Sequence, residues 1–228
     1  MTRPTEERSG SLHRFSRGER AVHWTFAALM TISVLTAAAL YIGSLSLLVG
    51  HRHVVEALHV YTGFALPAPV LIGLASRAYR ADLTRLDRFT ASDWQWLCSR
   101  TRRDGTIRVG KFNAGQKLNA ALTAGAVVVL LGTGVLMDST GLARLSWRTG
   151  ATFTHDWSAL ALGLLVLGHI SYALNDREAR RGMRTGQVST HWAHAEHAAW
   201  AEEVDPSPAS HPETSCSGRR RGLRRGCR

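Results

Sequence analysis

Four stretches of the sequence contain no Asp, Glu, Lys or Arg, and this feature leaves the chain very few possible folds. Each stretch is about as long as a helix must be to cross the roughly 30 Å hydrocarbon core of a membrane. A helix covering a soluble core would show a regular polar stripe, which these stretches lack. The sequence therefore predicts an all-α, integral membrane four-helix bundle. The uncharged stretches are Ala21–Gly50, Ala57–Ser76, Leu118–Met137 and Trp157–Asn175.

The helices of this bundle can be placed approximately. We expect them at residues 20–42, 54–77, 114–138 and 154–177. Pro67 and Pro69 should kink the second helix, which neighbouring helices in a membrane can accommodate.

Outside the four-helix domain at residues 20–177, three further segments are expected. Residues 1–19 form a basic cytoplasmic leader, and the apolar run that follows it is too long for the core of a cleaved signal peptide, so a retained helix is expected. Residues 178–204 carry Trp192 and Trp200 and predict an amphipathic surface segment. Residues 205–228 are rich in Pro, Ser, Gly and Arg, cannot bury a core, and are expected to be disordered.

The basic residues that give the formal charge of +11 are concentrated in alternate connections between the predicted helices. Basic residues crowd the N-terminus, the segment from Arg77 to Lys117 and everything after Asn175, whereas the two other connections are poor in them. This alternation follows the positive-inside rule and predicts cytoplasmic N- and C-termini in contact with membrane lipid. A nucleic-acid-binding face would not follow membrane topology, so no nucleic-acid partner is expected. The cysteines Cys98, Cys216 and Cys227 have no zinc or iron–sulfur spacing.

Four histidines lie in or near the uncharged stretches and can be sorted by depth. His23 lies near the start of a helix that enters from the cytoplasm, so we expect it near the inner surface. His59 and His155 lie near the starts of helices that enter from outside. His169 follows His155 by fourteen residues, about 21 Å along nearly the same helix face. The predicted pairs are His23 with His169 inside, and His59 with His155 outside.

Two facing imidazoles at one depth can bind a haem iron from both axial sides. Such iron has no open position, which favours electron transfer over oxygen chemistry. The sequence therefore predicts two b-type haems, with these four histidines as the iron ligands. Gly63, Gly163 and Gly168 would let a flat ring approach the helices, although they would equally allow close helix packing. The alternative is that the histidines are interfacial and bind backbone or lipid; a zinc site is disfavoured because no two share i, i+4 spacing.

Several segments carry a resemblance to a known family. They are RAVHW (Arg20–Trp24), LHVYTG (Leu58–Gly63), GKFNAGQK (Gly110–Lys117), GTGVL (Gly132–Leu136), THDWSALALGLLVLGHI (Thr154–Ile170) and RGMRTGQVSTHW (Arg181–Trp192). On these residues the chain resembles the gamma subunit of respiratory formate dehydrogenases, a four-helix di-haem cytochrome b of the bacterial inner membrane. The resemblance implies the same histidine pairing. The Arg-rich tail departs from the family, as do His191, His194 and His197, which partly replace basic residues.

The resemblance also implies a menaquinone site beside the inner haem, formed by Asn113, Gly115, Gln116 and His169. From the residues alone, Asn113 and Gln116 have the spacing of a capping box at the start of a helix. Both roles can hold together.

Charged residues surround this segment. Lys111, Lys117 and Asp104 could relay protons to a quinone, or could be ordinary solvated loop charges.

Taken together, these features predict the membrane anchor and electron-transfer subunit of a formate dehydrogenase complex. The resemblance implies an iron–sulfur (beta) subunit that supplies electrons, a catalytic molybdenum or tungsten (alpha) subunit, and a higher oligomer of the complex. Electrons would pass through the two haems to menaquinone. Nothing in the chain resembles a formate site. The alternatives are a cytochrome b of another respiratory complex, such as a hydrogenase or a thiosulfate or polysulfide reductase, and a haem-free membrane scaffold.

Overall fold

The computed structural model describes residues 10–100, 106–139, 141 and 143–206, and within them the chain is almost entirely helical. Four helical spans are long and apolar enough to cross a membrane. Many of their large apolar side chains, such as Leu35, Ile72 and Val128, are exposed. Such an exposed surface suits lipid tails and not water. The predicted all-α membrane bundle is confirmed. The spans are α1 (Arg17–Tyr41), α3 (Arg52–Ala65) with α4 (Pro67–Gly73), α7 (Ala114–Asp138) and α8 (Leu145–Asn175).

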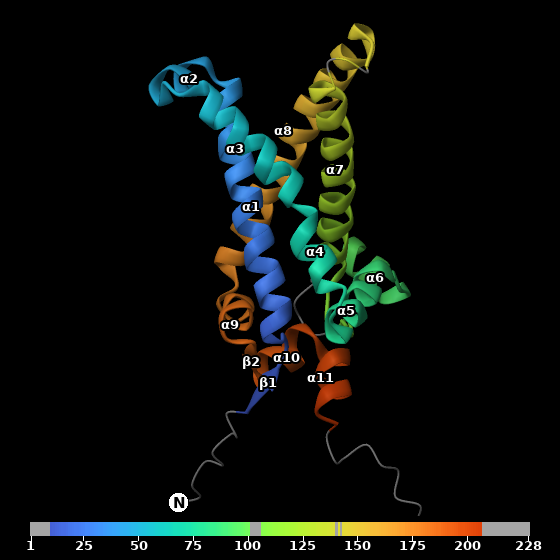
Figure 1. The fold of residues 1–228 in the computed structure, drawn as a ribbon. Coiled ribbons are helices and arrows are strands. Elements are labelled where there is room, and N and C mark those ends of the chain that lie inside the picture. Colours follow the sequence, from blue (N-terminus) through green and yellow to red (C-terminus); the bar gives the residue numbers. More distant parts are fainter. Residues whose placement is uncertain (1–9, 101–105, 140, 142, 207–228) are drawn as a thin grey trace, which may run out of the picture.

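These spans pack as two helical hairpins side by side (Figure 1). α1 lies along α3 and α4, and α7 lies along α8. Met30, Leu66, Val127 and Leu162 form a buried apolar cluster where the hairpins meet. α3 ends before Leu66, and α4 starts with Pro67 in its first turn, where a missing N–H costs no helical hydrogen bond. The kink expected at the prolines coincides with the boundary between α3 and α4, and because Leu66 keeps helical backbone angles the two helices form one continuous span.

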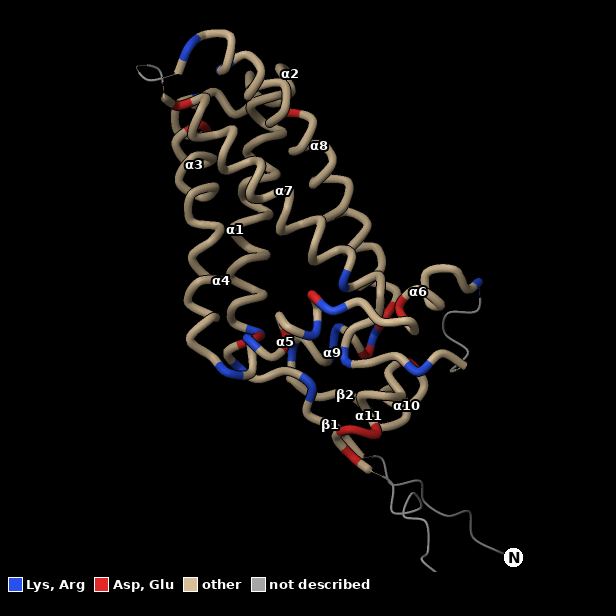
Figure 2. Tube along the Cα trace, turned by 90° about the vertical axis from the view of Figure 1, so that its right-hand side faces the viewer, with Lys and Arg blue, Asp and Glu red and all other residues tan. Residues whose placement is uncertain are grey.

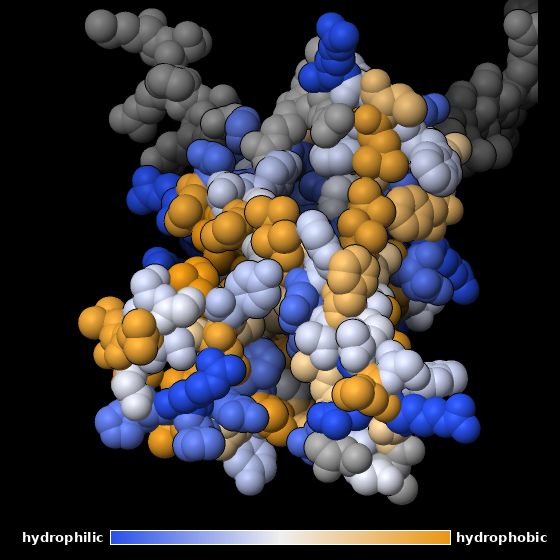
Figure 3. Space-filling model, turned by 90° about the horizontal axis from the view of Figure 1, so that it is seen from above, coloured by the Kyte–Doolittle hydropathy of each residue, from blue (hydrophilic) through white to orange (hydrophobic). Residues whose placement is uncertain are grey.

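The end of the bundle away from the chain termini differs from expectation in two ways. A short extra helix, α2 (Gly43–Val49), follows α1 and exposes Leu47 and Leu48. α8 begins at Leu145, nine residues before the expected start at residue 154. The sequence suggested a later start because the uncharged stretch begins only at Trp157, after Asp156, but a helix can continue beyond the membrane. Viewed onto this end, hydrophobic and hydrophilic side chains lie side by side (Figure 3).

The opposite end carries the short elements and much of the charge (Figure 2). Both ends of the described chain lie there, so the N- and C-terminal segments share one side of the bundle (Figure 1). Three residues of the predicted basic leader form a short strand: Ser11–His13 pairs antiparallel with Gln187–Ser189. The elements at this end are β1 (Ser11–His13), α5 (Arg77–Asp87), α6 (Ala91–Cys98), α9 (Arg177–Thr185), β2 (Gln187–Ser189), α10 (Thr190–Glu196) and α11 (Ala198–Val204).

A second, smaller core ties the C-terminal segment to the bundle. Val188, Ala193 and Trp200 are buried in it. The guanidinium group of Arg14 lies 4.8 Å from the Trp192 ring centre and contacts the Trp200 ring as well. The residues after α8 therefore fold as a compact cap on the charged end.

Candidate functional site

The structure brings the four histidines together in the two pairs expected from their depth. The rings of His23 (α1) and His169 (α8) have centres 6.3 Å apart at an angle of 58°. The rings of His59 (α3) and His155 (α8) have centres 6.3 Å apart at an angle of 73°. The two pairs lie at opposite ends of the membrane-length part of α8.

This ring spacing fits one metal ion between two imidazoles. A metal–imidazole bond is about 2.0 Å long, and the nitrogen lies about 1.1 Å from its ring centre, so axial ligands on one metal have centres roughly 6.2 Å apart. Both pairs are within about 0.1 Å of that value. Among the described residues, no group of three or more His, Cys, Asp or Glu is placed to hold a metal. Two protein ligands are the number that a haem iron takes, because the porphyrin supplies the other four.

Two threonines fix the orientation of the His59–His155 pair. Thr36 Oγ1 lies 3.0 Å from His59 Nδ1, and Thr133 Oγ1 lies 2.9 Å from His155 Nδ1. Each hydroxyl donates its proton to a carbonyl one turn earlier in its own helix, so its oxygen accepts from the ring. The Ser33 carbonyl also lies 3.2 Å from His59 Nδ1. Both rings therefore carry the proton on Nδ1 and leave the Nε2 lone pair available for a metal.

The sequence analysis missed these two threonines. A signal was present, because Thr36 and Thr133 are hydroxyl residues inside uncharged apolar runs, and such residues often bond between membrane helices. Which histidine each one meets depends on how the helices are packed together, and this cannot be read from a single sequence.

The two histidine pairs are separated by apolar packing. Leu162 lies seven residues from both His155 and His169, and it belongs to the buried cluster between the hairpins. This low-dielectric layer keeps the two sites apart.

The three glycines expected to face a ring have room beside them. A Cβ added at Gly63, Gly163 or Gly168 would meet no atom within 4 Å. Gly134 is different, because its added Cβ would lie 3.7 Å from His155 Cε1, so there the glycine brings α7 close to this histidine.

Asn113 and Gln116 form the expected capping box at the start of α7. Gln116 N–H donates to Asn113 Oδ1 at 2.9 Å, and Asn113 N–H donates to Gln116 Oε1 at 3.0 Å. Because both side-chain oxygens accept from the backbone, the two side-chain NH₂ groups are left as donors for other partners. Gly115 packs against the buried ring of Trp96, whose nearest atom would lie 3.0 Å from an added Cβ. His169 lies on α8 beside His23.

The lysines near this cap are not solvated loop charges. Lys111 and Lys117 are both buried, and each contacts a buried carboxylate: Lys111 Nζ lies 2.5 Å from Asp82 Oδ2, and Lys117 Nζ lies 2.6 Å from Asp93 Oδ2. The solvated interpretation is therefore wrong for these two residues. Asp104, the third residue of that group, lies outside the described residues.

One histidine of the C-terminal segment, His197, contacts other parts of the chain. His197 is buried, its Nδ1 lies 2.7 Å from the Gly110 carbonyl, and its Nε2 lies 3.1 Å from Arg14. This residue joins the C-terminal segment to the loop before α7.

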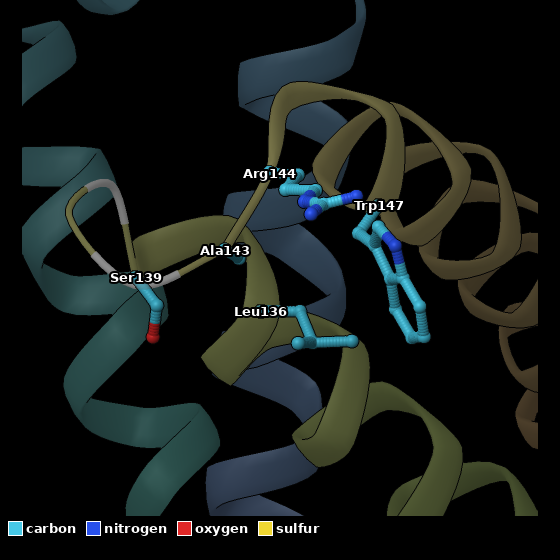
Figure 4. Close-up of a pocket in the computed structure, with 5 residues that line it drawn as sticks. All are labelled: Leu136, Ser139, Ala143, Arg144 and Trp147. Atoms are coloured by element: carbon cyan, nitrogen blue, oxygen red, sulfur yellow. The ribbon is translucent and has the colours of Figure 1, made fainter.

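A shallow pocket lies at the turn between α7 and α8, far from the charged end (Figure 4). It is lined by Leu136, Ser139, Ala143, Arg144 and Trp147, and includes none of the paired histidines. In Figure 4 Trp147 and Leu136 line one side while Arg144 covers the top.

Four membrane helices with two facing histidine pairs define a membrane cytochrome of the b type. Comparison with known families agrees: residues 14–186 match the prokaryotic cytochrome b561 family. The chain belongs to this family, which implies haem b as its cofactor.

The curated relatives confirm the resemblance to formate dehydrogenase cytochromes. The nitrate-inducible formate dehydrogenase cytochrome b556(Fdn) subunit of Escherichia coli K12 is 23% identical over 202 residues, which cover 84% of this chain and 90% of that protein. The formate dehydrogenase cytochrome b556(fdo) subunit of the same strain is 24% identical over 204 residues, covering 87% and 95%. A Shigella flexneri relative of the first is equally similar.

Proposed function

We propose that this chain is the membrane cytochrome b subunit of a formate dehydrogenase complex and passes electrons from an iron–sulfur partner to menaquinone. The observation that carries the proposal is the presence of two histidine pairs with 6.3 Å ring spacing, one toward each end of the bundle. The similarity to two formate dehydrogenase cytochromes supports formate as the electron source.

Haem, when bound by each pair, supplies one-electron transfer at a six-coordinate iron. The protein residues set the conditions for it. His59 and His155 hold the outer group, and Thr36 and Thr133 fix their rings through Nδ1. His23 and His169 hold the inner group.

Quinone reduction is assigned to the start of α7, at the same end as the inner pair. The capping box engages the side-chain oxygens of Asn113 and Gln116, so their NH₂ groups remain as donors for a quinone carbonyl. Gly115 and His169 complete the proposed site. The basic end of the bundle, with both termini, lies in the cytoplasm under this proposal. The formate-oxidising subunit and the iron–sulfur subunit are separate chains.

Haem counting and single substitutions test the cofactor assignment. Pyridine haemochrome analysis of the intact complex should give two haems for each copy of this chain. His169→Ala should remove the inner haem and quinone reduction, while His155→Ala should remove only the outer haem. Equal retention of both haems in either variant would contradict the pairing.

Electron-donor assays test the partner. Membranes containing the complex should show reduction of the b-type absorbance by formate. Reduction by hydrogen and not by formate would assign the chain to a hydrogenase. A complete lack of b-type absorbance after dithionite would indicate a haem-free scaffold.

A further inference from the structure

Three charged side chains from three parts of the chain meet in a buried cluster. The cluster lies at the charged end of the bundle, which we assign to the cytoplasm. They are Glu19 of α1, Asp82 of α5, and Lys111 of the segment before α7. Lys111 Nζ lies 2.5 Å from Asp82 Oδ2 and 3.5 Å from Glu19 Oε1. All three side chains are less than one-tenth exposed.

The cluster has one more acidic group than basic group. Asp82 and Glu19 share the Lys111 ammonium group and interact electrostatically with each other. Two buried carboxylates beside one ammonium group leave an uncompensated negative charge unless one of the carboxyl groups holds a proton. Burial beside Glu19 raises the pKa of Asp82 to about 7, although the Lys111 ammonium group acts in the opposite direction. Arg14 also faces Asp82, while Lys117 of α7 is occupied by Asp93.

The position of the cluster links it to both proposed sites at this end. Glu19 precedes His23 by four residues, so both lie on the same face of α1, one turn apart. Lys111 precedes Asn113 by two residues, and two residues span at most about 7 Å. The shared proton therefore lies next to the segment assigned to the quinone.

We propose that the Asp82–Glu19 carboxyl pair holds the proton that is delivered to the quinone at the start of α7, an inference that rests on the quinone site proposed above. In each delivery, the carboxyl O–H bond breaks and an O–H bond forms on a quinone oxygen. Two electrons from the dehydrogenase and two protons convert the quinone to a quinol. Water at the charged end returns a proton to the pair after each delivery. Lys111 positions the pair and keeps one carboxylate charged.

The chain contains a matched pair that separates this role from a structural one. Lys117 and Asp93 are just as buried and just as close, at 2.6 Å, but they form a balanced ion pair. Hydrogen bonds from Lys117 and Thr90 outweigh burial and lower the pKa of Asp93, so this pair carries no spare proton.

Oxidation of the reduced cytochrome by menadione tests the inference. Membranes containing the intact complex are reduced with stoichiometric dithionite, mixed with menadione, and followed by loss of the reduced haem absorbance. The wild-type rate should fall as the pH rises through about 7. Asp82→Asn should slow the reaction by roughly 100-fold and remove this pH dependence. Glu19→Gln removes the second acid, so the fall in rate should move to lower pH.

Controls separate the possible outcomes. Asp87→Asn changes an exposed carboxylate of the same helix and should leave the rate unchanged. Asp93→Asn should lower stability but keep the wild-type pH profile. An infrared band from a protonated carboxyl group should titrate near pH 7 in the wild type and be absent in Asp82→Asn. If Asp82→Asn loses haem, the Glu19→Gln profile decides the question.

Two results would overturn the inference, and they differ in meaning. A wild-type chain that menadione cannot oxidise would remove the quinone site and this inference with it. A wild type that reacts, with an unchanged pH profile in Asp82→Asn and Glu19→Gln, would leave the quinone site in place and exclude the carboxyl pair as its proton source.

Discussion

Asp82 and Asp93 are buried to nearly the same extent and each contacts a lysine, yet their responses to pH have opposite signs. Asp82 shares its lysine with a second acid, and the raised pKa follows from burial beside that acid. Asp93 also receives hydrogen bonds from Thr90, which together with Lys117 favour its charged form. The number of acidic groups around each lysine therefore decides whether the pKa of the aspartate is raised or lowered.

We expect these two residues to act on stability in separate pH ranges. Because the pKa of Asp82 is raised in the folded protein to about 7, its stabilisation is present below about pH 4 and is lost as the pH rises toward 7. Because the pKa of Asp93 is lowered, its stabilisation is present above about pH 4 and is lost on further acidification. For Asp82, the rise of the pKa from 3.8 to about 7 corresponds to a contribution of the order of 4 kcal/mol. Thermal unfolding in detergent checks this: Asp82→Asn should flatten the profile from pH 4 to 7, and Asp93→Asn the profile below about pH 4. Identical profiles for both variants would refute the assignment.

Thr133 should tune the outer haem without being needed to bind it. Its oxygen accepts from His155 Nδ1–H, which makes the opposite ring nitrogen a stronger ligand. Thr133→Val removes this acceptor, so the midpoint potential of the outer haem should rise by tens of millivolts, equivalent to one hydrogen bond of about 1 kcal/mol. Redox titration measures the shift. Thr31→Val is a matched control, because Thr31 bonds only to its own helix backbone among the contacts described. A shift of the same size in the control would argue against the proposed contact.

For single residues, the sequence predicted the features set by position along a helix and missed those set by packing between helices. The depth of each histidine depends on the helix rise and the topology, so both pairs could be foreseen. The contacts of Thr36 and Thr133 depend on the rotation of one helix against another. The pairing of Lys111 with Asp82 joins residues 29 apart through a fold that no local pattern specifies.

Two glycines with left-handed backbone end helices at opposite ends of the molecule. Gly50, with φ of 68°, has no atom within 4 Å of an added Cβ. Gly186, with φ of 85°, would place an added Cβ in direct collision with the Phe15 carbonyl oxygen. The Gly186 carbonyl also accepts hydrogen bonds from the backbone N–H groups of Arg14 and Phe15. Gly186 is thus where the C-terminal segment attaches to the N-terminal one.

Alanine at these two positions should therefore have unequal effects. Gly50→Ala should cost about 1 kcal/mol, the typical penalty for a left-handed alanine. Gly186→Ala adds a clash with backbone that cannot move without separating β1 from β2, so it should cost at least about 2 kcal/mol more. The unfolding midpoint and the rate of trypsin cleavage after Arg184 measure the two effects. Equal midpoints would mean that the C-terminal segment is not attached through Gly186.

Among the helices and strands too, those set by local sequence could be predicted, whereas those set by contacts between distant residues could not. The four membrane spans and the helix boundary at the prolines follow from local composition, and the structure contains them. The two strands are only three residues long and pair across 176 residues of sequence, so no alternation of side chains could reveal them. The early start of α8 was missed because the uncharged stretch marks only a membrane-length part of the helix. The helix itself is longer and begins before that stretch.

Over the whole molecule, charge and redox sites are arranged along one axis. The end with both termini carries α5, α6 and α9–α11 and much of the charge, while the membrane-length helices expose apolar side chains (Figure 2). If this end faces the cytoplasm, electrons move inward from the His59–His155 level to the level of His23 and His169. Each charge that crosses the membrane then stores roughly 2.3 kcal/mol per 100 mV. Energy conservation by the complex thus depends on which way the chain is inserted.

Cysteine labelling determines this orientation. Cys98 is exposed at the end of α6, on the charged side of the bundle. In a variant with Cys216→Ser and Cys227→Ser, a membrane-impermeant maleimide should label Cys98 in inside-out vesicles and not in intact spheroplasts. Ser44→Cys, combined with Cys98→Ser, places the thiol on exposed α2 at the other end and should give the reverse result. Labelling of Cys98 from the outside would invert the topology. Quinone reduction would then take its protons from the outer side, and electron transfer through this chain could not charge the membrane in the proposed direction.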